Sequence, residues 1–128
     1  MRKSVISIIM LMIILVTFIS CDKNPVALTV DKVQGNWAGN GDRAAFIFFI
    51  VRESYIDYFS LKFEYNGGLM QFRDFDPNVK IDNDMKFNIV MYASEKTLTV
   101  NGEFKSKNKC EGSFQFDGTS GTWQADQD

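Results

Sequence analysis

The sequence predicts an all-β fold, an antiparallel meander of about eight strands that forms a small closed barrel or a β-sandwich after an N-terminal signal peptide. Several segments alternate apolar and polar residues with a period of two, which is the period of a half-buried strand. Turn dipeptides separate these segments, at Asn40-Gly41, Asn66-Gly67, Asp82-Asn83 and Asp117-Gly118. No stretch after Val33 has the apolar period of a helix.

Four segments carry the alternation most clearly. The residues predicted to point into the core are Phe59, Leu61, Phe63 and Tyr65 in segment 58–65, Met85, Phe87, Ile89 and Met91 in segment 85–92, Leu98, Val100 and Phe104 in segment 98–104, and Cys110, Phe114 and Phe116 in segment 110–116. In the first segment, Ser60, Lys62 and Glu64 are predicted to point outward. Segment 44–51, AAFIFFIV, is apolar on both faces, which predicts a central strand or one whose outer side is covered. Asn101-Gly102 is consistent with a turn or with a bulge inside one long strand.

A tryptophan stands between small residues near each end of this domain. Trp37 lies in GNWAG, 35–39, and Trp123 lies in GTWQA, 121–125. Small residues on the same strand face leave room for an indole ring, so we expect both tryptophans in one core. The simplest arrangement makes the first and last strands neighbours, which closes the sheet and removes its exposed edges.

The Gly-x-Trp of the first of these segments, Gly35 and Trp37, resembles the motif in the first strand of lipocalin-like small β-barrels. The resemblance extends loosely over residues 35–125, although the chain is shorter than typical lipocalins and its sequence shows no closing helix. The chain is also similar to small bacterial lipoproteins of undefined activity that begin with Gly-x-Trp-x-Gly and end in a Trp-x-Ala strand. Both resemblances imply a small β-barrel, and neither implies a ligand.

Residues 1–20 have the organisation of a signal peptide. Arg2 and Lys3 give a short positive region, and the run from Val5 to Ile19 is apolar and uncharged. As a helix this run would span about 22 Å, which is less than a hydrocarbon core of about 30 Å. The alternatives are a signal peptide cut at another position and an uncleaved anchor.

The apolar run ends on a cysteine. Phe18-Ile19-Ser20-Cys21 resembles the lipobox of bacterial lipoproteins, in which a large apolar residue, a tolerant position and a small residue precede the Cys. Ser20 fits the small position, whereas Phe18 departs from the usual Leu and suits the looser lipoboxes of some lineages. The resemblance implies that Cys21 receives diacylglycerol, becomes the first residue of the mature chain, and holds it on the membrane through acyl chains such as palmitate. Two or three acyl chains anchor a protein far more firmly than one.

The predicted organisation is a lipoprotein signal peptide at 1–20, a lipidated tether at 21–33 and a β-barrel or β-sandwich domain at 34–128. The tether contains Pro25 and has no strong pattern. Removal of the signal peptide takes the net charge from −2 to −4. The expected location is the bacterial cell envelope, where the anchored domain is either periplasmic or surface-exposed, and Asp22 does not decide between the leaflets.

Few residues suggest chemistry. The chain has no histidine, which removes the commonest general base and metal ligand. The acidic segment 74–84 was compared with the pattern of a calcium loop. It does not fit, because Val79 stands where that pattern has Gly and Met85 stands where it has Glu. We therefore predict solvated turn and strand residues there, with an irregular calcium site as the alternative. No catalytic residue, cofactor-binding residue or metal ligand is predicted. The oxygen-bearing residues of this acidic segment are Asp74, Asp76, Asn78, Asp82 and Asp84.

Three further features each allow two interpretations. Cys110 is a buried small hydrophobe in a strand or a reactive thiol that forms an intermolecular bridge. Tyr58 and Tyr92 form a recognition surface or are ordinary half-buried strand residues. Alternate lysines around one hairpin tip protect strand edges from pairing, or attract a phosphate or an acidic partner. These lysines are Lys105, Lys107 and Lys109.

The aromatic content constrains the function. Eleven of the twelve phenylalanines follow the signal peptide. We expect them to fill the barrel and leave at most a shallow mouth, so that recognition falls to the outer sheet face and to loops such as 73–84. Those predicted to face inward are Phe49, Phe59, Phe63, Phe87, Phe104, Phe114 and Phe116.

The predicted function is a lipid-anchored envelope module that binds a protein, a glycan or a small molecule and has no catalytic activity. Cationic residues are not clustered enough to suggest nucleic acid. The alternatives are a structural or inhibitor-like envelope subunit that acts through one protein partner, and a carrier of a small hydrophobic ligand.

Overall fold

The structure is a computed structural model that describes residues 27–128. The predicted signal peptide, the predicted lipidation site Cys21 and the first part of the tether lie outside these residues. Among the residues that are described, no helix has the length and apolarity needed to cross a membrane.

One 3₁₀-helix precedes nine strands. The elements are η1 (Val30–Val33), β1 (Gly35–Gly41), β2 (Ala45–Arg52), β3 (Tyr55–Tyr65), β4 (Gly68–Asp74), β5 (Val79–Lys80), β6 (Lys86–Ala93), β7 (Lys96–Ser106), β8 (Lys109–Phe116) and β9 (Thr119–Gln127). The all-β prediction is therefore confirmed, and the ninth strand is the two-residue β5.

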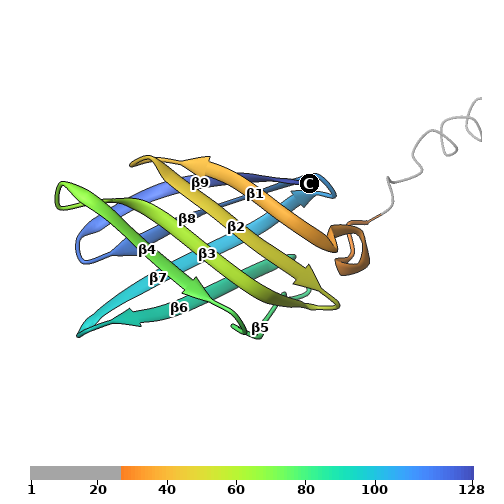
Figure 1. The fold of residues 1–128 in the computed structure, drawn as a ribbon. Coiled ribbons are helices and arrows are strands. Elements are labelled where there is room, and N and C mark those ends of the chain that lie inside the picture. The colour runs from red at the N-terminus through yellow and green to blue at the C-terminus, as the bar shows by residue number, and fades with distance from the viewer. Residues whose placement is uncertain (1–26) are drawn as a thin grey trace, which may run out of the picture.

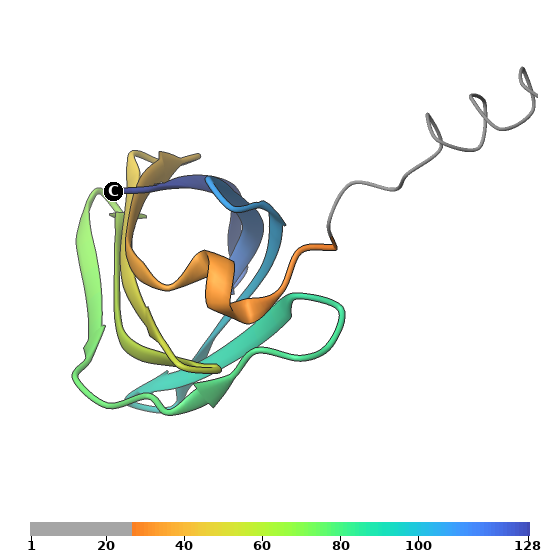
Figure 2. The same ribbon diagram turned by 90° about the vertical axis from the view of Figure 1, so that its right-hand side faces the viewer.

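The strands form a nearly closed antiparallel barrel (Figures 1 and 2). Their order in the sheet is β4-β3-β2-β1-β9-β8-β7-β6, and β5 pairs with the start of β3. The first and last long strands, β1 and β9, are neighbours as predicted. β4 and β6 are the two ends of the sheet and do not pair with each other, so the barrel is open between them. This is a barrel rather than a sandwich, with one side less closed than the prediction of a closed barrel.

The barrel interior is one continuous hydrophobic core. All seven phenylalanines predicted to face inward are buried, and Phe72 on β4 joins them. Tyr65 and Met91, also predicted to face inward, are partly buried against this core. Cys110 is 1% exposed on β8, which confirms its interpretation as a buried small hydrophobe. Aromatic rings fill the centre, where Phe49 contacts Trp37, Phe87, Phe104 and Trp123.

Both tryptophans are buried in this core, as predicted. The Trp37 indole N–H donates to the carbonyl of Val33 at 2.8 Å, and that of Trp123 donates to Ser113 at 3.3 Å. The space for Trp123 comes from glycines on neighbouring strands. A Cβ on Gly102 or Gly112 would lie 2.9 or 2.7 Å from the Trp123 ring. The ring therefore lies over backbone that carries no side chain.

The turns agree with the sequence at most positions. Asn66-Gly67 and Asp117-Gly118 are two-residue hairpin turns with positive φ at both residues. Near Asp82-Asn83, the Met85 N–H donates to the Asp82 carbonyl at 3.0 Å and closes a turn. Asn101-Gly102 lies inside the uninterrupted β7.

The turn predicted at Asn40-Gly41 is wrong, because both residues lie in β1. The chain turns at residues 42–44, where Arg43 and Ala44 have positive φ. Gly41 instead allows β1 and β9 to approach closely, since a Cβ there would lie 2.1 Å from the Thr122 carbonyl oxygen.

The end of the predicted tether packs on the barrel. Val33, the last residue of η1, is fully buried, and Leu28 and Val30 pack against the core. Gln34, directly after η1, holds the turn between β2 and β3 by accepting from the Glu53 N–H and donating to its carbonyl. The chain is therefore fixed to one end of the barrel from about residue 28 onward.

Candidate functional site

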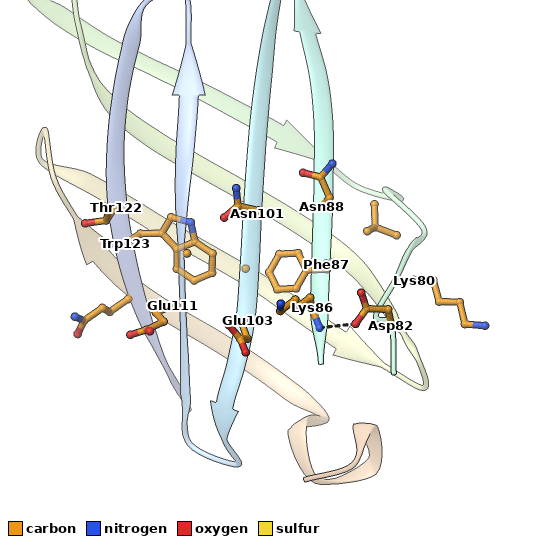
Figure 3. A pocket seen from close by; sticks show the side chains of 14 residues that line it. Lys80, Asp82, Lys86, Phe87, Asn88, Asn101, Glu103, Glu111, Thr122 and Trp123 are labelled. Atoms are coloured by element: carbon orange, nitrogen blue, oxygen red, sulfur yellow. Dashed lines mark hydrogen bonds between the residues drawn. The ribbon is translucent and has the colours of Figure 1, made fainter. Parts of the chain in front are cut away.

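The outer face of β6, β7, β8 and β9 carries an open groove of about 1010 Å³. Its position on the outside follows from strand alternation, because the groove residues Asn88 and Asn101 are exposed while their strand neighbours are buried, and the exposed Glu111 follows the buried Cys110. Figure 3 shows that these side chains come from successive strands and that Asp82, which follows β5, lies beside Lys86. The groove was not predicted from the sequence.

The pairing register of β6 to β9 aligns the polar side chains of this face in two rows across the strands. One row is Lys86, Glu103, Glu111 and Gln124, each directly opposite the next on β6, β7, β8 and β9. The other row is Asn88, Asn101, Ser113 and Thr122, in the same order of strands. Between them on the inner face lies the row Phe87, Gly102, Gly112 and Trp123. The same register thus places hydrogen-bonding groups outside and the Trp123 packing site inside.

The glutamates of the first row lie beside two lysines, Lys86 of the row itself and Lys105. Lys105 Nζ lies 3.1 Å from Glu103 and 3.8 Å from Glu111. The hydrogen bond to Glu103 is the main reason that the pKa of Lys105 is raised. Glu103 and Glu111 are directly opposite each other on β7 and β8, so their carboxylate oxygens give this part of the groove hydrogen-bond acceptors.

The second row is held by short-range hydrogen bonds. Asn101 Oδ1 accepts from the Ser113 hydroxyl at 3.0 Å and from its backbone N–H at 3.3 Å. Asp42, from the turn after β1, accepts from the backbone N–H and the hydroxyl of Thr122 at 2.9 and 3.0 Å. The backbone hydrogen bond from Thr122 is the main reason that the pKa of Asp42 is lowered. These bonds hold the side chains of Asn101 and Thr122 in place.

The structure separates the acidic residues that were considered as calcium ligands. Asp74 accepts from the backbone N–H of Asp76, whereas Asp82 accepts from the N–H groups of Asp84 and Lys86. Within residues 27–128, no group of three His, Cys, Asp or Glu side chains is placed to hold a metal ion. The carboxylates of Asp74 and Asp82 therefore act as local turn acceptors.

A second surface feature lies on the outer face of β2 and β3 and just after β4. We call it the aromatic patch, and its residues are Phe46, Phe48, Ile50, Tyr58 and Phe75. Tyr58 packs edge-on against Phe48 on one side and Phe75 on the other. Ser60, which was predicted to point outward, is only 8% exposed. It is directly opposite Phe48 on β2 and Arg73 on β4. In segment 44–51, Phe48 and Ile50 are half-buried and Phe46 is exposed, so the outer side of this segment is only partly covered.

The remaining candidates are spread over the barrel. Tyr58 belongs to the aromatic patch, whereas Tyr92 is 75% exposed on β6. The alternate lysines at the β7–β8 hairpin do not protect an edge, because both strands are paired on both sides. Burial raises the pKa of the Cys110 thiol, which disfavours the reactive thiolate. Cys21 lies outside the described residues.

Comparison with known proteins adds little to this geometry. No protein-family model matches the chain, and no curated protein sequence matches it. A solved structure of a redesigned β-barrel is similar over 82% of this chain and 98% of its own, with 9% sequence identity and a TM-score of 0.48. The assignment of the barrel rests on the strand pairing described above.

Proposed function

We propose that this chain is a lipid-anchored binding module of the bacterial cell envelope that recognises a polar ligand, of which a glycan is the best-fitting class. The polar groove is the observation that carries the proposal. Its two rows present carboxylate, amide and hydroxyl groups on neighbouring strands, which match the alternating donors and acceptors of a sugar. The envelope location and the anchor rest on the sequence around Cys21.

The filled interior supports recognition on the outside. The inward side chains form a single buried cluster with closely spaced aromatic rings. An eight-stranded barrel has room for one small ligand only when its inward side chains are small. The hydrophobic-carrier alternative is therefore less well supported than a groove-binding module.

The proposal includes no catalytic step. The carboxylates that line the groove are those of Asp82, Glu103 and Glu111, and the two glutamates contact Lys105 rather than a nucleophile. A catalytic pair of carboxylates needs two different environments, whereas Glu103 and Glu111 both have solvent-accessible side chains and share Lys105.

The anchor is tested by metabolic labelling. A labelled fatty acid should enter the wild-type chain and should not enter Cys21→Ala. Equal labelling of the two chains would contradict lipidation at Cys21.

The ligand class is tested with soluble peptidoglycan fragments as the probe and full-length protein in detergent. Asn101→Ala should weaken binding about tenfold, because one hydrogen bond to a polar ligand is lost. Thr97→Ala, at an exposed position of β7 that does not line the groove, is the matched control and should bind like wild type. No saturable binding, or equal binding by both variants, would contradict glycan recognition in the groove.

A protein partner is the second candidate, and the open side of the barrel favours it. β6 is unpaired on one side, carries no charge from Phe87 to Ala93, and exposes Val90 and Tyr92. Unpaired apolar edges pair readily with an added strand of another protein. Crosslinked capture from intact cells should recover one stoichiometric partner with wild type and much less with Val90→Lys. Equal recovery of that partner with Val90→Lys would contradict strand addition at β6.

A further inference from the structure

One side of the β6 backbone faces the opening of the barrel. The Met85 carbonyl accepts a hydrogen bond from the Phe104 N–H on β7 at 2.9 Å. The next residue, Lys86, bonds on the other side to Asp82, through its N–H and its carbonyl, each at 2.9 Å. Backbone groups alternate in this way along an antiparallel strand, so every second residue after Lys86 points its N–H and carbonyl away from β7. Because β6 is an end of the sheet, no strand within residues 27–128 pairs with these groups. The residues concerned are Asn88, Val90 and Tyr92.

The second half of β6 is the half that another strand can reach. At the start of the strand, Asp82 already occupies the free edge beside Lys86. Figure 1 shows that β4 and β6 separate toward the β3–β4 and β6–β7 hairpins, so the barrel opens widest beside the end of β6. An added strand would therefore pair with β6 from about Asn88 onward.

This edge lacks the features that keep strands from pairing with other chains. Residues 87–93 include no charged residue and no proline, and their register with β7 contains no bulge. Val90 is 47% exposed and Tyr92 is 75% exposed. The other free edge, β4, ends in Arg73 and Asp74. Charges, prolines and bulges are the means by which proteins block an open edge, so β6 is the less protected of the two edges.

The side chains of this edge are complementary to a second copy of the same strand. Two copies related by a twofold axis place residue i opposite residue j and j opposite i. With Met91 on the axis of an antiparallel pair, Val90 of each copy lies opposite Tyr92 of the other. An aromatic residue opposite a β-branched one is a favourable cross-strand pair, and here the two residues also exchange backbone hydrogen bonds. Registers shifted toward the start of β6 would place the second strand on Asp82.

The charged residues at the two ends of β6 are compatible with this pairing. Lys86 begins the strand and Glu95 lies in the turn after it, so antiparallel pairing brings Lys86 of each copy beside Glu95 of the other. Within residues 27–128, neither side chain has an ion-pair partner. Lys96, next to Glu95, pairs with Asp117 at 2.9 Å. The Lys86 end is neutral overall and does not repel the Glu95 turn. Its charged residues are Lys80, Asp82, Asp84 and Lys86.

We propose that two copies of this chain pair through the free edges of β6, antiparallel about a twofold axis at Met91, and so join two barrels in one continuous sheet. The inference rests on the second candidate function, strand addition at β6, and names the partner as a second copy. Pairing uses the edge of the sheet rather than its outer face. The polar groove of each copy therefore stays open to its ligand.

The first test is sedimentation equilibrium of the full-length protein in density-matched detergent over a range of concentrations. Wild type should be a dimer in equilibrium with monomer. Val90→Lys should raise the dissociation constant about tenfold or more, because a lysine on the paired edge must lose water. Phe46→Lys is the matched control, since Phe46 and Val90 are both 47% exposed and Phe46 lies on β2; it should dimerise like wild type. A monomeric wild type, an unaffected Val90→Lys, or equal weakening by the two substitutions overturns the proposal.

The second test measures the register by disulfide formation in intact cells treated with an oxidant. In Met91→Cys the two new thiols lie directly opposite each other, in a pair whose Cα atoms are about 4.5 Å apart, which is within disulfide range. In Tyr92→Cys the two thiols lie diagonally, although Tyr92 is the more exposed residue. Met91→Cys should give a crosslinked dimer on a non-reducing gel, well above Tyr92→Cys and above wild type, in which Cys110 is buried. No crosslink in Met91→Cys, or an equal one in Tyr92→Cys, overturns the register.

Crosslinked capture from the same cells separates this inference from the function on which it rests. If the chain is monomeric and captures a different protein that Val90→Lys loses, the second copy fails and strand addition at β6 stands. If no capture and no dimer depends on Val90, both fail. Binding of peptidoglycan fragments is measured separately, and neither outcome changes the test of the groove. Thermal melts that match wild type confirm that the variants are folded.

Discussion

The two halves of the barrel, β1 to β4 and β6 to β9, have similar inner faces and different outer faces. Inside, each half contributes one tryptophan, Trp37 or Trp123, to a shared aromatic core. Outside, the first half carries the aromatic patch, whereas the second half carries the polar groove. The barrel is held together by the inner residues of both halves. The outer residues do not pack in this core, so their chemistry can differ between the halves.

This comparison separates residues that hold the fold from residues that form the outer surface. A strand presents successive side chains to opposite faces, so one strand supplies both sets without conflict. Substitutions of inner residues should therefore lower the free energy of unfolding of the barrel by similar amounts in both halves. Substitutions of outer residues should affect the two halves differently.

The largest expected effect is the loss of either tryptophan. Trp37→Ala and Trp123→Ala should each lower the free energy of unfolding by about 3–5 kcal/mol, because each removes a buried ring and leaves a cavity. Urea denaturation followed by circular dichroism measures both values. A change within error for either variant would show that the two inner faces are not equivalent.

Gly112→Ala tests the space beneath Trp123. The new Cβ would lie 1.8 Å from the Asn101 carbonyl oxygen and 2.7 Å from the Trp123 ring, so backbone or ring must move. We expect a loss of about 1–3 kcal/mol of unfolding free energy, together with a change in tryptophan emission. Gly68→Ala is the matched control, because the nearest atom to its Cβ is 4.0 Å away. An equal loss of unfolding free energy for Gly112→Ala and Gly68→Ala would contradict the prediction that Gly112 leaves space for the Trp123 ring.

Phe48→Ala tests whether the aromatic patch also contributes to stability. Phe48 is half-buried and packs edge-on against Tyr58, with 5.8 Å between the two ring centres. Its replacement by Ala should therefore lower the free energy of unfolding by about 1 kcal/mol. Val90→Ala, on the outer face of the other half, should stay within about 0.5 kcal/mol of wild type. Thermal unfolding of the two variants side by side compares the outer faces, and a larger loss for Val90→Ala would reverse the comparison.

The smallest effect concerns the bond between Asp42 and Thr122, which joins the two halves at the β1–β2 turn. The hydrogen bonds lower the pKa of Asp42 in the folded state, so its stabilisation is present at neutral pH and is lost as pH falls through that lowered value. Asp42→Asn should be less stable than wild type at pH 7, and the difference should shrink in acid. Unfolding curves at several pH values measure it. A difference that is independent of pH would mean that the carboxylate charge does not contribute.

Several turns could not be predicted because they contain no glycine. Glu53 and Ser94, like Arg43 and Ala44, adopt positive φ, although ordinary residues disfavour it. Their conformation is imposed by the strands on either side, which must reverse within two or three residues to keep the antiparallel register. The sequence alone shows only the turns whose residues favour that conformation, such as Asn66-Gly67.

The sequence by itself determined which residues face inward, that the fold is an antiparallel meander, and that β1 meets β9. The physical reason for the first two is that burial follows the period of two along each strand, which is a local property. The pairing of β1 with β9 was predicted from the matched tryptophan segments 35–39 and 121–125. Only the tertiary structure decided that Lys86 and Gln124, far apart in the chain, lie in one row, that β4 and β6 stay unpaired, and that Arg73 stacks beside the aromatic patch. These features depend on the register between strands and on barrel closure, which arise from the packing of the whole core rather than from any single segment.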